Sequence, residues 1–372
     1  MLAKNRLATA VAVGLGASLI GAASADNAFF PYLALGTQVT TVVSVMNTGA
    51  NNWTQNGGVV TGGQVGKGNL HYRMYYKQVN GQGDNAKVCQ EVNTYLPTSQ
   101  YDIQSIDIGA HFGATTKGVL FNDPSVNNNW KASGKDYALG RTLGNARAYL
   151  VVDNAESGSS GASTVTGEAF VFDYVAGAVF GYQASTGYGS DTSYWGEIHT
   201  AAPNPSTITV LPLAETTTAI FVTPLANAPT IQTDSQGMTP FGGNSYESTI
   251  ALWTYGSYAL YDRDENLVSG STPAVVRCVG RVDMTDLISL GAQAYLPDGG
   301  WGSIANQRTN TIDVVFPNKP EVAFDPTTAY PLGETSLIKL EYNLTGTFNG
   351  EAIPGLYNNG FRILGAPDPV AP

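Results

Sequence analysis

Three oxygen-bearing side chains alternate along the stretch YDRDENL, at Asp262, Asp264 and Asn266. A calcium loop of the EF-hand type presents its oxygen ligands at the same every-second-residue spacing. Such a loop also needs glycine at its sixth position and a bidentate glutamate at its twelfth. Counted from Asp262, these positions hold Leu267 and Pro273. The spacing therefore resembles a calcium loop, but two of its required residues are missing.

A polar turn explains the same residues without a metal. Aspartate and asparagine accept hydrogen bonds from a turn backbone and tolerate left-handed dihedral angles. We therefore predict a solvated turn between two strands. A weak, partly hydrated calcium site remains the alternative, and it would need Asp283 and Asp286 to complete its ligands. Calcium is the one cofactor that these residues suggest.

A second group of chemically capable residues lies in SYWGEIHT. On an extended chain Trp195, Glu197 and His199 point to the same side, which brings a carboxylate and an imidazole together beside an aromatic ring. Such a pair suits acid–base chemistry or metal binding. A metal would need a further ligand, and His71 and His111 are the remaining histidines. The competing interpretation is an exposed strand end beside a linker.

Enzyme signatures are otherwise weak. We find no G-x-S-x-G nucleophile elbow and no glycine-rich phosphate loop between a strand and a helix. Glycoside hydrolysis needs two opposed carboxylates. Sequence alone does not show whether any two of the carboxylates in the predicted strands converge: Glu91, Asp102, Asp107, Glu168 and Asp173. We expect a protein that is not an enzyme.

Trp53 and Trp130 differ from the other aromatic residues because they lie in the asparagine-rich segments NNWTQN and VNNNWKAS. An exposed indole flanked by amides can stack on a sugar ring while the amides bind its hydroxyl groups. It can equally anchor its own loop to the domain, or pack into a neighbouring subunit. Trp53 and Trp130 are therefore candidate ligand-binding residues, with glycans as the ligand class.

The N-terminus indicates export. Lys4 and Arg6 precede an apolar segment from Leu7 to Ile20, and Ala23-Ser24-Ala25 supplies the small residues of a signal-peptidase site. We predict a signal peptide at residues 1–25, cleaved after Ala25. No later segment is long and apolar enough to span a bilayer, so we expect no membrane span in the mature chain. The expected location is the cell surface or the medium, with the periplasm as the alternative.

Charge and composition narrow the partners. The net charge is −11, and it becomes −13 once Lys4 and Arg6 are removed. So acidic a chain repels nucleic acid and anionic lipid, and we therefore expect no nucleic-acid partner. Charged residues make up only 13% of the chain, against 43% hydrophobic residues, which are enough for packed cores. This composition is typical of an exported all-β protein.

The two cysteines, Cys89 and Cys278, lie about half a chain apart. In an oxidising compartment they can form a disulfide that closes a very long loop. The chain-entropy model gives such a bridge roughly 5 kcal/mol of stabilisation. Two separate buried thiols, or intermolecular bridges, are the alternatives.

Apolar residues recur with period two through most of the chain. In LHYRMYYKQV and in LIKLEYNL, alternate residues are apolar, which predicts strands with one face on a core and the other in water. The best helical candidate is the short segment Met284 to Ala292. The fold class that follows is all-β, with antiparallel sheets packed as β-sandwiches of immunoglobulin-like or jelly-roll-like type.

The length favours two tandem sandwich domains. The proline-containing stretch HTAAPNPST suggests a boundary near residue 200, which gives an N-terminal domain over residues 26–200 and a C-terminal domain over residues 201–372. Each half carries a tyrosine-rich strand, a polar turn and a cysteine-bearing strand, which suggests a duplication. We also expect the apolar segment DNAFFPYLAL to form an edge strand or to complement a neighbouring subunit.

These features predict an exported, non-enzymatic structural or adhesive protein of the bacterial cell surface or of an extracellular filament, layer or matrix. Its expected partners are further copies of itself or other cell-surface components. The alternative is a secreted carbohydrate-binding module or glycan-active enzyme that uses Trp53 and Trp130.

Overall fold

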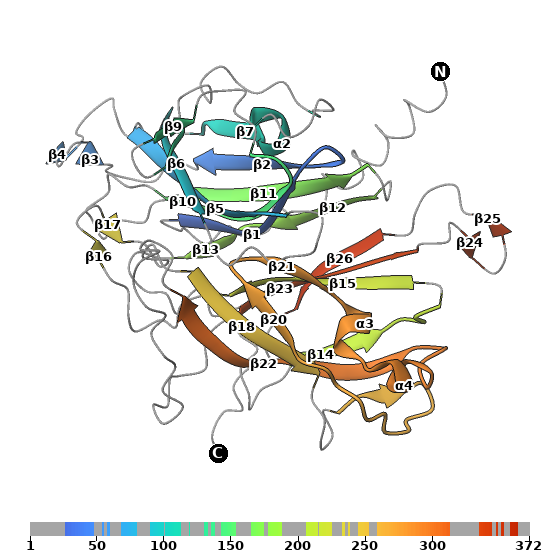
Figure 1. The fold of residues 1–372 in the computed structure, drawn as a ribbon. Coiled ribbons are helices and arrows are strands. Elements are labelled where there is room, and N and C mark those ends of the chain that lie inside the picture. The colour runs from blue at the N-terminus through green and yellow to red at the C-terminus, as the bar shows by residue number, and fades with distance from the viewer. Residues whose placement is uncertain are drawn as a thin grey trace, which may run out of the picture.

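The computed structural model describes 22 parts of the chain, which together carry the main sheets. They are residues 27–47, 54–55, 58–59, 68–79, 90–99, 101–112, 119, 130–132, 135–137, 143–153, 165–174, 178–187, 206–214, 216–224, 233–234, 237–238, 245–252, 259–312, 335–343, 347–348, 351–352 and 358–363. The fold is mostly β, with four larger antiparallel sheets and few helices (Figure 1). The all-β prediction is therefore confirmed. Among these residues, no helix has both the length and the apolar character needed to cross a membrane.

The strands before residue 188 form two of the larger sheets. Sheet 1 has the order β13-β1-β10-β5-β6-β8-β9, and sheet 2 has the order β12-β11-β2-β7. The strand bounds are β1 Asn27–Leu35, β2 Val39–Asn47, β3 Thr54–Gln55, β4 Gly58–Val59, β5 Gly68–Gln78, β6 Gln90–Thr98, β7 Ile103–Asp107, β8 Trp130–Ala132, β9 Lys135–Tyr137, β10 Ala146–Asp153, β11 Val165–Asp173, β12 Ala178–Gln183 and β13 Ser185–Gly187. A short helix, α2, follows β7 at Ile108–His111.

The strands after residue 205 form the other two. Sheet 3 has the order β14-β22-β18-β20, with β19 also paired to β22, and sheet 4 has the order β21-β15-β23-β26. The bounds are β14 Ser206–Val210, β15 Thr216–Pro224, β16 Thr233–Asp234, β17 Gly237–Met238, β18 Ser245–Leu252, β19 Tyr261–Asp262, β20 Ala274–Arg277, β21 Gly280–Asp283, β22 Gly300–Ile312, β23 Thr335–Asn343, β24 Thr347–Phe348, β25 Glu351–Ala352 and β26 Asn358–Ile363.

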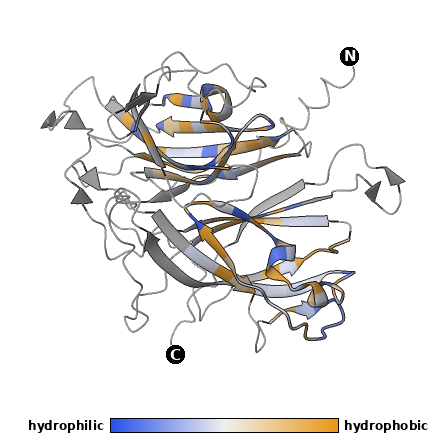
Figure 2. Cartoon of the chain, viewed as in Figure 1, coloured by the Kyte–Doolittle hydropathy of each residue, from blue (hydrophilic) through white to orange (hydrophobic). Residues whose placement is uncertain are grey.

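No sheet in the described part of the chain mixes strands from the two sides of residues 188–205. We call residues 27–187 the N-terminal strand group and residues 206–363 the C-terminal strand group. Figure 1 shows the blue-to-green strands of the first group together above the yellow-to-red strands of the second. Figure 2 shows hydrophobic and hydrophilic segments on the strands of both groups.

The best helical candidate is correct in place but broken in the middle. Helix α3 spans Met284–Leu287 and helix α4 spans Leu290–Gln293. Between them Ile288 is extended (φ −124°, ψ 122°) and forms a β-bridge with Ser271. The helix is interrupted because the Ile288 backbone is extended and bridges Ser271. The apolar period of the sequence nevertheless continues through the segment.

Strand β1 was expected at an edge, and the structure places it inside sheet 1. It pairs with β10 along its length and with β13 at its first residues. Its register with β10 shifts between Phe30 and Leu33, around Pro31, where a residue without an N–H is tolerated. All the hydrophobic side chains from Ala28 to Leu35 are buried. FFPYLAL is therefore a core segment, which explains its uninterrupted apolar character.

Sheet 4 also departs from the expected pattern, because it is buried on both faces. On one face Ile220 and Leu337 belong to the same core as Ile304 of sheet 3. On the other face Phe221 and Ile338 belong to the core of the N-terminal strand group. Sheet 4 therefore lies between sheet 3 and the N-terminal group, and no face of its central strands β15 and β23 is left for water.

The polar face predicted for LIKLEYNL is consequently not exposed to solvent. Lys339 is 0% exposed and Glu341 is 3% exposed. The Lys339 ammonium forms an ion pair with Glu341 and donates to the Thr209 carbonyl (2.7 Å) and hydroxyl (2.8 Å). Burial lowers the pKa of Lys339, while Glu341 raises it in partial compensation. A charged pair in the core thus mimics, in sequence, the solvent face of an ordinary strand.

Candidate functional site

The two strand groups meet through stacked aromatic rings. The Tyr32 ring from β1 stacks on the Phe221 ring from β15, with centroids 3.8 Å apart and planes 12° apart. The Phe180 ring from β12 also stacks on Phe221, with centroids 5.4 Å apart. Tyr182 fixes Tyr32 in place, since its hydroxyl donates to the Tyr32 carbonyl and accepts from the Tyr32 N–H (3.2 Å). The contact is therefore a packed core, which we call the junction.

Hydrogen bonds cross the junction beside these rings. The Thr223 hydroxyl of β15 donates to the Pro31 carbonyl, at the point where β1 loses its regular register. The Lys77 ammonium, 1% exposed, donates to the Arg277 carbonyl at 3.0 Å. Both bonds satisfy backbone oxygens of one group with side chains of the other. The junction is thus specific in geometry as well as apolar.

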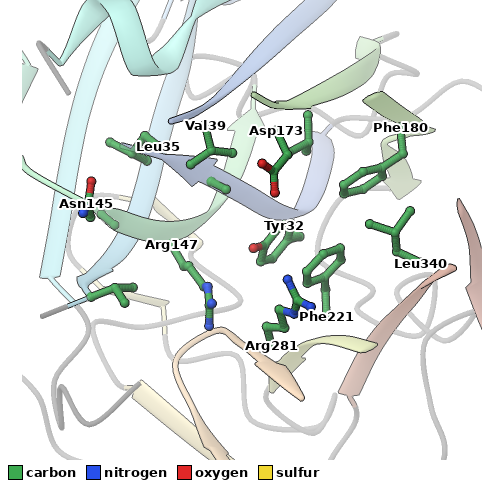
Figure 3. A pocket seen from close by; sticks show the side chains of 14 residues that line it. Tyr32, Leu35, Val39, Asn145, Arg147, Asp173, Phe180, Phe221, Arg281 and Leu340 are labelled. Atoms are coloured by element: carbon green, nitrogen blue, oxygen red, sulfur yellow. The ribbon is translucent and has the colours of Figure 1, made fainter. Parts of the chain in front are cut away.

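A cavity of about 180 Å³ lies within the junction (Figure 3). Both strand groups are needed to form it. Its lining comprises Tyr32, Ala34, Leu35, Val39, Val79, Asn145, Ala146, Arg147, Val171, Asp173 and Phe180 from the first group and Phe221, Arg281 and Leu340 from the second. Most of this wall is apolar and buried, and the charged groups are Arg147, Arg281 and Asp173.

Strand register explains how the two arginines reach the cavity. Arg281 of β21 is opposite Phe221 of β15, so the two side chains share one face of sheet 4. Arg147 of β10 is opposite Ala34 of β1 in sheet 1. Asp283 steadies Arg281, because its Oδ1 accepts from Nε and from Nη2, each at 2.8 Å. In Figure 3, both guanidinium groups lie on one side of the Tyr32 ring and Asp173 lies on the other.

No family model matches this chain, and no curated protein matches it significantly. The cavity must therefore be interpreted by its chemistry alone. It combines aromatic walls, the Arg147 guanidinium, the Arg281 guanidinium paired with Asp283, and the Asp173 carboxylate.

The acidic stretch YDRDENL forms a closed turn. The Asp262 Oδ1 accepts from the backbone N–H of Asp264 (2.9 Å) and of Asn266 (2.8 Å). The Asn266 amide donates to Oδ2 at 3.0 Å, and Glu265 adopts a left-handed dihedral (φ 66°). These bonds, led by the one from the Asn266 side chain, lower the pKa of Asp262. The geometry agrees with a polar turn; calcium binding stays a prediction.

The additional ligands that calcium would need are engaged elsewhere. Asp283 binds Arg281, and the Asp286 carboxylate accepts from the Asp283 N–H at 3.1 Å at the start of α3. Within the part of the chain that the structure describes, no three histidine, cysteine, aspartate or glutamate residues are grouped so as to hold a metal.

The strand carboxylates have separate environments. Asp107 is fully buried at the N-cap of α2, where its carboxylate accepts from the Thr40 hydroxyl and from the N–H groups of Ala110 (3.0 Å) and Val119 (2.6 Å). Asp102 accepts from the Gln104 amide at 3.3 Å. Asp107 therefore caps the N-terminus of α2 and stabilises the fold locally.

The other two described carboxylates lie on β11. Asp173 lines the cavity, whereas Glu168 is half-buried five residues earlier on the same strand, opposite Ser44. The side chain of Glu91 lies outside the described residues. Among the described members of this set, Asp173 is the one that lines the cavity.

Several predicted residues lie outside the described part of the chain: the signal peptide at 1–25, Trp53, Cys89, Trp195, Glu197 and His199. The backbone of Trp130 starts β8, but its side chain is not described. The glycan interpretation of Trp53 and Trp130 stays a prediction. A different aromatic pair is described, in which Tyr261 stacks on Trp301 at 4.8 Å across β19 and β22.

Cys278 is disulfide-bonded and lies in the tight turn between β20 and β21, with a left-handed dihedral (φ 64°). The neighbouring Arg277 carbonyl accepts the hydrogen bond from Lys77 of the other strand group. Because the chain has two cysteines, Cys89 is the candidate partner within the chain. Cys89 lies outside the described residues, so this pairing stays a prediction.

The two histidines that were considered as further metal ligands are accounted for differently. His111 is 3% exposed at the end of α2, and burial lowers its pKa to about 4, so it is neutral at pH 7. His71 stacks on Tyr95 with centroids 4.2 Å apart. They come from different elements, α2 and β5, and each has its own aromatic neighbour.

Proposed function

We propose that this chain is an exported, non-enzymatic structural or adhesive protein of the bacterial cell surface or of an extracellular assembly. The observation that carries the proposal is the junction, where sheet 4 has one face on sheet 3 and the other on the N-terminal strand group. Two strand groups that share an apolar core in this way would move as one body. A rigid body suits a protein that bears load or presents a fixed surface.

The modules would be two β-sandwiches in tandem, of immunoglobulin-like or jelly-roll-like type, over residues 26–200 and 201–372. Support comes from the sheets, because sheets 1 and 2 use only strands before residue 188 and sheets 3 and 4 only strands after 205. The export signal at residues 1–25 and the location at the surface, in the medium or in the periplasm belong to the same proposal.

Self-association is the proposed mode of assembly. Strand β12, at the edge of sheet 2, and strand β26, at the edge of sheet 4, lie against each other in the junction. Each edge thereby covers the other, and neither is open to pairing with a second chain. Because β1 lies inside sheet 1, assembly through other edges or faces is favoured over the exchange of DNAFFPYLAL.

The test is to express the full chain in a bacterium with an outer membrane and follow its fate. We expect cleavage after Ala25, exposure to added protease at the cell surface or recovery from the medium, and oligomers or ordered assemblies by sizing and electron microscopy. A protein that keeps residues 1–25 and stays in the cytoplasm would contradict export. A purified mature protein that remains a monomer and associates with no surface would contradict the structural role.

The alternative of glycan binding is separated by the same purified protein. A glycan array bound by the native chain and lost in Trp53→Ala or Trp130→Ala would favour a carbohydrate-binding module. Full binding by both variants would show that these tryptophans are not the binding platform.

A further inference from the structure

We propose that strand β7, at the edge of sheet 2, pairs antiparallel with β7 of a second copy of this chain, so that the two copies share one continuous sheet. The inference rests on the proposed self-association and names the surface that carries it. Three observations support it: an edge that no described strand pairs, exposed apolar side chains along that edge, and a strained tyrosine at its start.

The first observation is the set of backbone groups that β7 directs away from its neighbour. β7 ends the order β12-β11-β2-β7, and no strand in the described part of the chain pairs with its other side. Ser105 lies opposite Ser44 of β2, and their hydroxyl groups are hydrogen-bonded at 2.8 Å, as suits a pair whose backbones are not bonded to each other. Because bonded and non-bonded pairs alternate, the N–H and C=O groups of Ile103 and Ser105 point away from β2.

The chain enters β7 through a strained residue. The Tyr101 N–H donates to the Asn47 carbonyl (2.7 Å) and the Asn47 N–H donates to the Asp102 carbonyl (2.9 Å), which forms a β-bulge with two residues opposite one. Tyr101 has a left-handed dihedral (φ 63°) at the position where this bulge favours glycine. Its side chain is 70% exposed, so burial does not offset the strain. A strained and exposed aromatic residue is a candidate anchor for a partner.

Apolar side chains continue along this edge. Ile103 is 58% exposed and lies opposite Met46, which is half-buried. At the other end of β7 the side chain of Val119 is exposed, and the Val119 N–H donates to the Asp107 carboxylate. Asp107 is the one charged residue of β7, and it is fully buried. The strand therefore exposes no charge that would prevent pairing with another strand.

The other described edges of the larger sheets are protected in ways that β7 is not. Strands β12 and β26 cover each other, and β13 has only three residues. The remaining edges carry a charged side chain, receive one, or follow proline: β9 with Lys135 and Asp136, β14 with Lys339 bonded to its Thr209 carbonyl, β20 with Arg277 and the preceding Pro273, and β21 with Arg281 and Asp283. Short, charged and covered edges resist pairing, which leaves β7 as the edge suited to it.

A second copy fits this edge because the edge is complementary to itself. In an antiparallel pair about a two-fold axis at Gln104, Ile103 of each copy lies opposite Ser105 of the other. Both residues direct their backbone groups outward, so this register joins the strands by two bonded pairs. It also brings the Tyr101 end of one copy to the Val119 end of the other. Since the chain has a net charge of −11, an edge strand without exposed charge is a favourable place for two copies to meet.

Pairing at β7 leaves the junction undisturbed. Figure 1 shows β7 beside β2 and α2, on the side of the N-terminal strand group away from the C-terminal group. Two copies joined there would each keep the shared core of their own strand groups.

Sedimentation velocity of the purified mature chain, over a range of concentrations, measures the association. We expect a monomer–dimer equilibrium with a dissociation constant in about the micromolar range, because one strand pair with a few apolar contacts is smaller than a standard interface. Ile103→Lys places a charge on the edge and should weaken association about tenfold or more. Val275→Lys is the matched control, since Val275 is also 58% exposed on an edge strand, β20, and it should associate as the native chain does.

Tyr101→Gly separates an anchoring role from a structural one. Glycine adopts a φ of 63° without strain, so the melting temperature of the dilute monomer is expected to stay the same or rise. Association is expected to weaken about tenfold or more, as for the loss of an aromatic anchor. A lower melting temperature with unchanged association would contradict the anchoring role.

A disulfide between copies tests the register. Residues opposite each other in a bonded antiparallel pair have Cα atoms about 5.5 Å apart, which a disulfide can bridge. After mild oxidation, a mixture of Ile103→Cys and Ser105→Cys chains, one of them tagged, is expected to give more cross-linked dimer than either variant alone.

The outcomes separate this proposal from the proposed function. Equal association of the native chain, Ile103→Lys and Val275→Lys would overturn pairing at β7 and leave self-association through another surface. A native chain that stays monomeric at every concentration would overturn both. Cross-linking in the mixture no greater than in the single variants would overturn the antiparallel register.

Discussion

The turn at Asp262–Asn266 and sheet 4 represent two ways of placing polar groups in this protein. In the turn, the Asp262 carboxylate accepts hydrogen bonds from Asp264 and Asn266, both within four residues along the chain. In sheet 4, Lys339 bonds Thr209, which is 130 residues away, and Thr223 bonds Pro31, which is 192 residues away. The first arrangement is local and solvated, whereas the second exists only because distant strands pack. Changes to sheet 4 should therefore disturb the whole fold, and changes to the turn should not.

Breaking the buried ion pair is expected to have the largest effect. Replacing Lys339 with Met leaves Glu341 charged and buried without its partner, which costs about 3–5 kcal/mol of unfolding free energy. The double variant Lys339→Met/Glu341→Leu removes both charges and should recover most of that loss. Urea unfolding of the three proteins measures this. If the double variant is no more stable than the single one, the pair does not have the buried character assigned to it.

Removing the ring at the junction is expected to have a similar or slightly smaller effect. Phe221→Ala deletes a side chain that stacks on both Tyr32 and Phe180 and should cost about 3–4 kcal/mol. Val275→Ala, at a site 58% exposed, is the matched control and should change stability by less than about 0.5 kcal/mol. Equal losses in both variants would show that the junction adds nothing to stability.

Two pKa values show the same contrast between packing and local structure. Burial lowers the pKa of His111, whereas local hydrogen bonds lower the pKa of Asp262. The folded-state pKa of His111 is about 4, against 6.5 in the unfolded chain. Its contribution is therefore complete above pH 6.5 and declines as the pH falls toward 4, by about 3 kcal/mol in all. Unfolding free energies of the native chain and of His111→Gln across this range should differ in slope. Parallel pH profiles would contradict a buried neutral histidine.

The smallest effect is expected in the turn. Asn266→Ala removes the side-chain donor that contributes most to lowering the pKa of Asp262. We expect that pKa to rise toward 3.8 in an NMR titration, while global stability changes by less than about 0.5 kcal/mol. A large loss of global stability would mean that the turn is coupled to the core and is not a local structure.

The same contrast explains what could be predicted from sequence. Period-two patterning identified the strands in LHYRMYYKQV and LIKLEYNL, and the composition indicated the fold class, because both depend on local order. Turn chemistry at Asp262 was equally accessible, since its partners are neighbours in sequence. The junction was not. Nothing near Phe221 indicates Tyr32 as its partner.

Lys339 and Glu341 show why alternation misleads when both faces of a strand are buried. A lysine and a glutamate at alternate positions have the pattern of a solvent face, and only their mutual pairing permits burial. In β1, by contrast, the uninterrupted apolar run FFPYLAL was a sequence signal of burial on both faces, because a strand that is apolar on both faces is covered on both. It indicated that both faces of β1 are covered, but not which other strands cover them.

The two strand groups share one core through Tyr32 and Phe221. A double-mutant cycle with Tyr32→Ala, Phe221→Ala and the double variant tests it directly, by urea unfolding of the full mature chain. The stacked pair at 3.8 Å predicts a coupling free energy of about 0.5–1.5 kcal/mol. Losses that add to within about 0.3 kcal/mol would contradict the shared core.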